Sequence, residues 1–148
     1  MSAPLIGVYT RSGDDHLQRV LDELSKRRLA VVCFDSADFP LSLHLAARFD
    51  AGQPSWQGDF DHQGQHYRLE DFCSIWYRRP SRTYTFASGL SDAGYQYAKA
   101  EARRGFEGVL YSLPCLWVSH PDAILAAEWK PGQLFYLQSR QHAFKNTL

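Results

Sequence analysis

Two adjacent arginines, Arg78 and Arg79, follow an apolar run and come directly before Pro80. The run from Cys73 to Tyr77 predicts a buried strand, which should end here because proline lacks the N–H that a sheet ladder needs. Guanidinium groups at a rigid strand end can bind a carboxylate or phosphate through paired hydrogen bonds. The stretch therefore indicates an anion-binding site.

The same arginines also have a purely structural interpretation. The topology can bring three carboxylates near them, those of Asp35, Asp38 and Glu101, and such pairs would only tie loops to a helix. Successive strand residues face opposite ways, so we expect at most one arginine to face a ligand while the other packs against a helix. The residues themselves leave both interpretations open.

The first third of the chain predicts a strand, a helix and a second strand. Leu5 to Tyr9 and Leu29 to Phe34 are short apolar runs, and apolar residues recur at helical spacing from about Asp15 to Arg28. This order within about 30 residues is typical of a right-handed crossover between two parallel strands.

The rest of the chain completes an α/β pattern. We expect an edge strand over 41–49, a hairpin of 55–60 and 66–69, a helix over 92–113, a strand over 116–118, and helices starting at Asp122 and near Pro131. The predicted fold is Rossmann-like, with a mixed, mostly parallel sheet, helices on both faces and a β-hairpin insertion. Loops 10–15, 35–40 and 78–80 should meet at the carboxyl ends of the strands, where open sheets bind ligands.

Composition excludes several classes of protein. The 148 residues suit one domain, and 45% hydrophobic residues suffice for a core. Lys and Arg number 16, as do Asp and Glu, which argues against a nucleic-acid or membrane-surface binder. We find no signal-peptide pattern and no apolar run of about 20 residues, so we expect a cytoplasmic protein without membrane contact. Its cysteines lie in apolar settings and should be reduced core residues: Cys33, Cys73 and Cys115.

Other residue sets that could do chemistry are weaker. His62 and His66 flank the predicted hairpin turn and could approach each other around a metal, but a solvated turn is the simpler interpretation, and we expect no metal site. Cys115 and His120 could form a nucleophile pair, but a buried cysteine is usually inert. Asp14 and Asp15, with Asp35 and Asp38, resemble the acidic pocket of a receiver domain, but the receiver interpretation is excluded because the strand that should end in aspartate ends in arginine. No glycine-rich phosphate loop is present.

Four stretches in order resemble the N-terminal, pre-ATP-grasp domain of the ATP-grasp ribosomal peptide maturases, the microviridin-type or graspetide ligases. They are FDSADFP (34–40), SIWYRRP (74–80), EARRGFEGVL with LWVSHP (101–110 and 116–121), and EWKPGQL (128–134). No single motif is specific, but the ordered set covers residues 3 to 134. The resemblance implies a pre-ATP-grasp domain over 1–134 and an atypical tail over 135–148, where the ATP-grasp domain would begin.

The resemblance also implies a chemistry. Such ligases use ATP and Mg²⁺ to activate a side-chain carboxylate of a precursor peptide as an acyl phosphate, and a hydroxyl or amine of the same peptide then closes an ester or amide ring. The N-terminal domain packs against the catalytic lobes and helps to form a homodimer. Lys130 matches the lysine that opens the helix beside the nucleotide phosphates.

After Leu134 the sequence departs from this pattern. FYLQSRQHAFKNTL contains no Pro-x-Thr, no phosphate-covering glycine loop and no Mg²⁺ ligand set. We therefore expect no catalytic residue and no cofactor in this chain alone, and a role in dimerisation and active-site closing. A truncated chain, a broken reading frame and a stand-alone accessory domain all fit. The alternative function is a free-standing module that binds a small anion or peptide carboxylate at a crevice beside Arg78 and Arg79.

Overall fold

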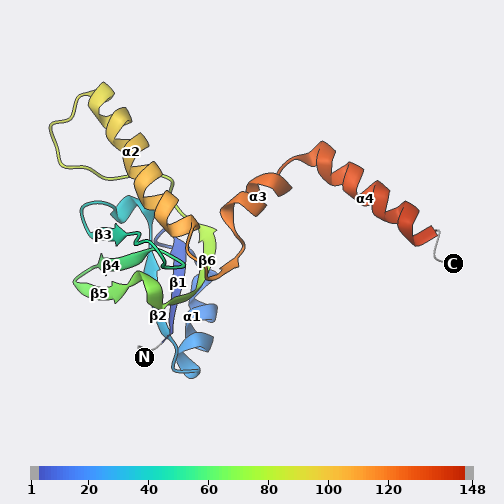
Figure 1. The fold of residues 1–148 in the computed structure, drawn as a ribbon, viewed down its shortest axis with the longest axis horizontal. Helices are drawn as coiled ribbons and strands as arrows, with labels where there is room; N and C mark the ends of the chain where they lie inside the picture. The colour runs from blue at the N-terminus through green and yellow to red at the C-terminus, as the bar shows by residue number, and fades with distance from the viewer. Residues whose placement is uncertain (1–3, 146–148) are drawn as a thin grey trace. The chain divides into compact units, whose positions relative to one another are not determined.

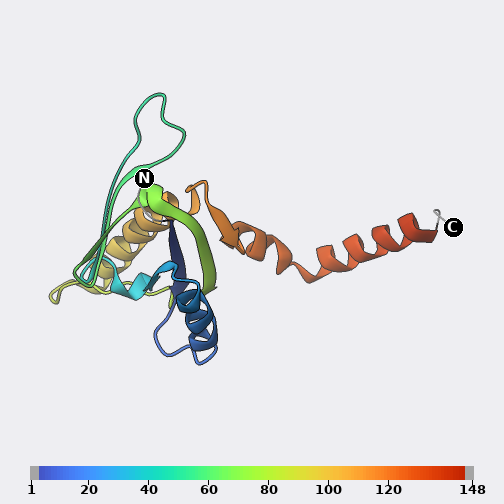
Figure 2. The same ribbon diagram turned by 90° about the horizontal axis from the view of Figure 1, so that it is seen from below.

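The structure, a computed structural model, describes residues 4–145 and divides into two compact units, Met1–Val118 and Ser119–Leu148 (Figures 1 and 2). The first unit contains the strands β1 (Leu5–Thr10), β2 (Ala30–Phe34), β3 (Leu43–Arg48), β4 (Gln57–His62), β5 (Gln65–Arg68), β6 (Phe72–Arg79) and β7 (Leu116–Val118), with the helices α1 (Leu17–Lys26) and α2 (Asp92–Tyr111). The second unit contains the helices α3 (Pro121–Ala127) and α4 (Lys130–Lys145).

A four-stranded parallel sheet in the order β2-β1-β6-β7 forms the centre of the first unit. Helix α1 connects β1 to β2, which pairs with one side of β1. The later strand β6 pairs with the other side of β1. The carboxyl ends of β1, β2 and β6 therefore lie side by side. This confirms the predicted α/β fold with a mostly parallel sheet.

The predicted hairpin insertion is also confirmed, and it is part of a three-stranded antiparallel sheet in the order β3-β4-β5. The segment expected as an edge strand supplies β3. Gly58 of β4 has a φ of +149°, and a Cβ added there would lie 1.9 Å from the backbone oxygen of Ala46. This close approach of two backbones requires glycine.

Aromatic side chains join the two sheets and α2 into one core. Tyr9 and Phe34 are register partners on β1 and β2, and their rings stack with centroids 5.0 Å apart. Phe60 of β4 meets Phe34 at 5.0 Å, and Phe106 of α2 meets Tyr9 at 6.1 Å. All four side chains are fully buried. The core therefore holds α2 against one face of the parallel sheet, while α1 lies on the other face (Figure 2).

One strand boundary differs from prediction in a way that matters for the site. The central strand was expected to end at Tyr77, but β6 continues through Arg78 and Arg79. Thr10 is the register partner of Arg79, and the N–H of Arg11 donates to the carbonyl of Arg79 at 3.0 Å. The ladder thus runs to the last residue before Pro80, because a neighbouring strand is available to pair with it.

The second unit consists of two helices whose starts lie one residue before the predicted ones. His120 caps α3 by accepting from the N–H of Asp122, and Pro121 occupies the first turn. The boundary expected after Leu134 falls inside α4, and residues 146–148 of the expected tail lie outside the described residues. Among residues 4–145, no helix is long and apolar enough to cross a membrane.

Candidate functional site

Arg78 is held in place at the end of β6 by an ion pair and an aromatic ring. Its Nε lies 3.2 Å from Oδ2 of Asp14, and its guanidinium carbon lies 5.9 Å from the ring centroid of Trp76. Trp76 and Arg78 are two residues apart on the strand and so share a face. The side chain of Asp14 is only 5% exposed and that of Arg78 23% exposed.

This ion pair contains no hydrogen bond between its two close atoms. Arg78 Nε and Asp14 Oδ2 are both buried and make no hydrogen bond within the described residues, although their separation would allow one. The N–H is therefore not directed at the carboxylate oxygen. Charge attraction, together with the flanking indole of Trp76, fixes the guanidinium.

Arg78 pairs with Asp14, and not with any of the three carboxylates that were expected to pair with the arginines. Asp14 belongs to the loop after β1, and β1 lies directly beside β6, so this loop reaches Arg78 first. Glu101, one of the expected partners, accepts instead from Arg104 one turn along α2 at 2.6 Å. The sequence signal for Asp14 was the adjacent pair Asp14-Asp15 after the first strand.

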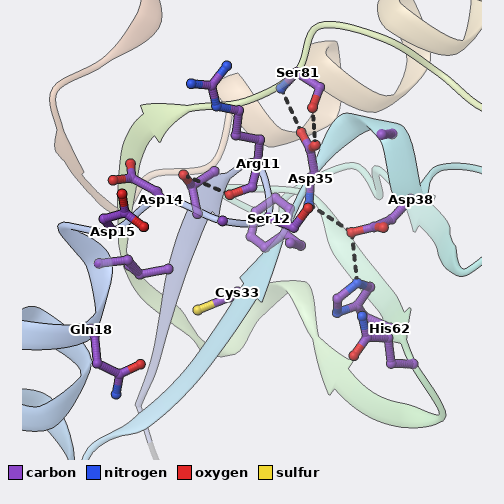
Figure 3. A pocket seen from close by; sticks show the side chains of 16 residues that line it. Arg11, Ser12, Asp14, Asp15, Gln18, Cys33, Asp35, Asp38, His62 and Ser81 are labelled. Carbon is purple, nitrogen blue, oxygen red and sulfur yellow. Dashed lines mark hydrogen bonds and ion pairs between the residues drawn. The ribbon is translucent and has the colours of Figure 1, made fainter.

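The other two expected partners, Asp35 and Asp38, bind serine and histidine. Asp35 accepts from the backbone N–H of Ser81 at 2.8 Å and also from the Ser81 hydroxyl. Asp38 accepts from the backbone N–H of Asp35 and contacts Nε2 of His62, both at 3.0 Å. Figure 3 shows these contacts as a chain running from Ser81 to His62. The two carboxylates thus tie the loop after β2 to the segment after Pro80 and to β4.

Arg79 faces away from these contacts and is exposed. Its backbone carbonyl accepts from the N–H of Arg11 at 3.0 Å. The two arginines thus lie on opposite faces of the strand, but not as expected: the half-buried Arg78 pairs with Asp14 instead of lining the crevice, and Arg79 is exposed instead of packed against a helix.

A crevice of about 720 Å³ opens at the carboxyl ends of β1 and β2 (Figure 3). It lies where the predicted loops were expected to meet, and its walls come from residues 10–15, from Asp35, Ala37 and Asp38, from α1 and from Ser81. Four carboxylates line it, those of Asp14, Asp15, Asp35 and Asp38, against the single arginine Arg11.

The charge of this crevice differs from the basic site expected there. Arg78 and Arg79 are not among its described lining residues, because the guanidinium of Arg78 turns to Asp14 and Trp76. Four carboxylates would repel the phosphates of a nucleotide, and loop 10–15 is not a glycine-rich phosphate cradle. The residues of this crevice do not fit ATP, and within the described residues no group of three or more His, Cys, Asp or Glu could hold a metal ion.

The two histidines that flank the hairpin turn face opposite sides of their sheet. His62 is buried and contacts Asp38, whereas His66 is exposed and contacts Oδ1 of Asp61 through Nδ1 at 2.6 Å. His66 pairs with Asp61, and His62 pairs with Gln65. The two histidines therefore belong to neighbouring register pairs, whose side chains point to opposite faces of the sheet. They therefore cannot share a metal.

Only part of the expectation for the cysteines holds, because Cys33 and Cys115 are half-buried whereas Cys73, also expected in the core, is exposed. Burial raises the pKa of the Cys115 thiol to about 11, and burial also raises the pKa of Cys33, which lines the crevice. Both side chains are thus protonated thiols at neutral pH and poor nucleophiles. His120 is occupied in capping α3, so the Cys115–His120 nucleophile pair has no support.

A buried acid that the sequence analysis did not identify anchors the loop after Pro80. Glu107 of α2 accepts from the hydroxyl of Tyr84 and from Nε of Arg103, both at 3.0 Å. Burial, followed by the nearby charge of Glu107, raises the pKa of Tyr84 far above its ordinary value. The spacing of Arg103 and Glu107, four residues apart on a helix, was the available signal.

Lys130, the third candidate ligand-binding residue, is the first residue of α4 in the second unit. Its Nζ lies 3.4 Å from Oε1 of Gln133, one turn further along the helix. The side chain is exposed, and this contact ties it to its own helix.

The fold and the ordered motifs define a pre-ATP-grasp domain. The family described as the MvdD pre-ATP grasp domain matches residues 6–124, and the chain belongs to this family. No curated protein matches.

Solved structures of three ligases share the fold. The Chryseobacterium gregarium RiPP-associated ATP-grasp ligase, in complex with ADP and a leader and core peptide, superposes with a TM-score of 0.80 at 23% identity, over 92% of this chain and 41% of that one. The Microcystis aeruginosa MRC macrocyclase MdnB gives 0.76 and 23% over 92% and 44%, and MdnC bound with precursor peptide MdnA gives 0.74 and 20% over 91% and 44%. The chain spans about two fifths of the length of these ligases.

Proposed function

We propose that this chain is the N-terminal domain of an ATP-dependent peptide ligase that closes side-chain ester or amide rings, and that it is non-catalytic by itself. The family match over residues 6–124 carries the proposal. ATP and Mg²⁺ would be held by ATP-grasp lobes, since the crevice of this chain does not suit phosphates. The precursor peptide would be the substrate of the assembled enzyme, which we place in the cytoplasm.

The domain would act in assembly, by dimerising and by closing the active site. Leu116 and Val118 of the edge strand β7 are 67% and 47% exposed, which leaves apolar surface for a partner. Arg78 would contribute to closing, because Asp14 and Trp76 hold its guanidinium in one orientation. A fixed guanidinium binds a carboxylate or phosphate at a lower entropy cost than a mobile one. Lys130 would add a second cation near the nucleotide phosphates.

A chimera tests this function. Residues 1–134 would replace the corresponding N-terminal part of the Chryseobacterium gregarium ligase. Ring closure on the leader and core peptide of that ligase would be measured by mass spectrometry, because each ring formed lowers the peptide mass by one water. We expect a folded chimera that closes rings and an isolated chain that does not. Arg78→Ala in the chimera should lower the rate at least 10-fold, with Arg79→Ala as the matched control. A folded chimera without any ring closure would contradict the proposal.

A stand-alone module that binds a small anion or peptide carboxylate is the second candidate. The observation in its favour is the positioned guanidinium of Arg78, although the neighbouring Asp14 already offsets its charge. Calorimetric titration of the chain with inorganic phosphate, acetate and ATP with Mg²⁺ would decide. If the chain is such a module, one of these ligands should give a saturable binding heat that Arg78→Ala removes. If the chain acts only as a domain of the ligase, no binding heat should be detectable at millimolar ligand.

A further inference from the structure

Strand β2 forms one edge of the parallel sheet and carries no protection against pairing with another strand. It pairs with β1 on one side, and within the described residues no backbone hydrogen bond joins its other side to another segment. Its register with β1 runs from Ala30 to Phe34 without a bulge, and its sequence, AVVCF, contains no charge, proline or glycine. Natural proteins protect sheet edges with such features, so an unprotected edge indicates a place where another strand can be added.

Both ends of this strand border open space. At its amino end, Ala30 and Val31 line a pocket of about 490 Å³ between the strand and α1. At its carboxyl end, Cys33 and Phe34 line the crevice of about 720 Å³ described above, and Figure 3 shows Cys33 among the side chains there. Four of the five residues of β2 therefore lie beside a pocket, all within the first unit.

The two pockets carry opposite charge. Arg28 is the charged residue that lines the pocket at the amino end, whereas four carboxylates and one arginine line the crevice. Arg28 and Asp15 of the crevice are both exposed and so can be reached by a ligand. Five strand residues span about 16 Å at roughly 3.3 Å per residue, so opposite charges at the two ends of an extended segment of similar length would match both pockets.

The charges also set the direction of an added strand. A peptide antiparallel to β2 begins at the crevice and ends beside Arg28. In this direction its positive amino end meets the carboxylates and its negative carboxyl end meets the guanidinium, whereas a parallel peptide would place like charges together. Antiparallel pairing is also slightly more stable per residue than parallel pairing. Charge and hydrogen-bond geometry therefore favour the same direction.

We propose that β2 binds an extended peptide segment as an added antiparallel strand. A basic residue at the amino end of the segment enters the acidic crevice, and an acidic residue at its carboxyl end lies beside Arg28. Main-chain hydrogen bonds supply affinity in this mode of recognition, and the pockets supply selectivity. The site is separate from Arg78, which lines neither pocket among the described residues. It does not depend on the ligase role, so the ring-closure assay can fail without affecting it.

Calorimetric titration of the chain with the peptide Lys-Thr-Val-Thr-Val-Thr-Glu, blocked at both ends, tests the charges. We expect saturable binding that Arg28→Glu and Asp15→Lys each weaken about 10-fold or more. Arg19→Glu is the matched control, because Arg19 is exposed on α1 and lines neither pocket, so this variant should bind like the parent chain. The reversed peptide Glu-Thr-Val-Thr-Val-Thr-Lys should bind the double variant Asp15→Lys, Arg28→Glu more tightly than it binds the parent. Circular dichroism would verify that all variants are folded.

N-methylated forms of the same peptide test the backbone pairing. Alternate N–H groups of a strand point to the same side, so methylation of the second, fourth and sixth residues and methylation of the third and fifth residues block opposite edges of the peptide. One form should lose binding and the other should keep it. Equal binding by both forms, charge variants that bind like the parent, or no saturable heat at about 1 mM peptide would overturn the proposal. No peptide binding together with a dimer in sedimentation would overturn it in favour of a second copy of β2 as the occupant.

Discussion

The Nε atom of Arg78 lies 3.2 Å from Oδ2 of Asp14, across the junction between two neighbouring parallel strands. The pair joins the loop after β1 to the last residues of β6, so it links the two segments that border the carboxyl edge of the sheet. Because the side chain of Asp14 is only 5% exposed, the removal of either partner would leave a buried group without its ion pair.

Asp14→Ala should destabilise the first unit by about 1–3 kcal/mol. The loss of a buried partner typically costs ~3–5 kcal/mol, and we expect less here because Arg78 can reach solvent. Urea unfolding followed by circular dichroism measures the effect. Asp15→Ala is the matched control, since Asp15 is exposed and should change stability by less than about 0.5 kcal/mol. Equal losses in both variants would argue against a structural ion pair.

Tyr84→Phe should cost about 1–2 kcal/mol in unfolding free energy. The substitution removes the hydroxyl that donates to the buried carboxylate of Glu107, which then keeps only Arg103. Tyr97→Phe on the exposed side of α2 should have no measurable effect. Thermal or urea unfolding of both variants, measured side by side, would show whether the loop after Pro80 depends on this hydrogen bond.

Gly58→Ala should be among the most damaging small substitutions, at roughly 2 kcal/mol or more. The added Cβ would lie 1.9 Å from the Ala46 carbonyl oxygen, and the positive φ is itself unfavourable for alanine. Gly108→Ala is the control, because nothing lies within 4 Å of a Cβ at that helical position. That variant should be neutral or more stable by about 0.5–1 kcal/mol. A tolerated Gly58→Ala would mean that β3 and β4 can separate at this point.

The thiols should react in the order of their exposure. Cys73 is exposed and should react with a disulfide reagent at pH 8 before Cys33 and Cys115, whose pKa values burial raises. Counting modified cysteines by mass spectrometry over time would check this order. Modification of Cys115 in the folded chain as fast as that of Cys73 would contradict this order.

The raised pKa of Cys115 also predicts an alkaline loss of stability. The unfolded thiol ionises near its ordinary value of 9.0 and the folded one near about 11, so the unfolded state loses its proton first. The contribution is therefore fully present below pH 9 and is lost as the pH rises from 9 to about 11. The urea midpoint of the parent chain should fall across this range by more than that of Cys115→Ala.

Much of the fold follows from local sequence patterns. The apolar runs of β1 and β2 and the helical spacing of α1 lie within a few residues of prediction, because hydrophobic periodicity and turn residues act locally. The end of β6 was misplaced by two residues, since its last ladder contacts depend on Thr10 of β1 and on Arg11, the residue after that strand. The end of the ladder at Pro80 could be predicted from the residue type alone, because proline has no N–H to donate.

The sequence by itself determined the class of domain, the meeting of the three loops at the carboxyl edge of the sheet, and the placement of Arg78 and Arg79 on opposite faces of their strand. These depend on residue type and on the period of a strand, which need no distant partner. Only the tertiary structure decided that Asp14 pairs with Arg78, that Asp35 binds Ser81, and that the crevice is acidic. Those contacts depend on which strands become neighbours and how their loops turn. Charges far apart in the chain acquire partners only when the sheet order β2-β1-β6-β7 brings their loops together.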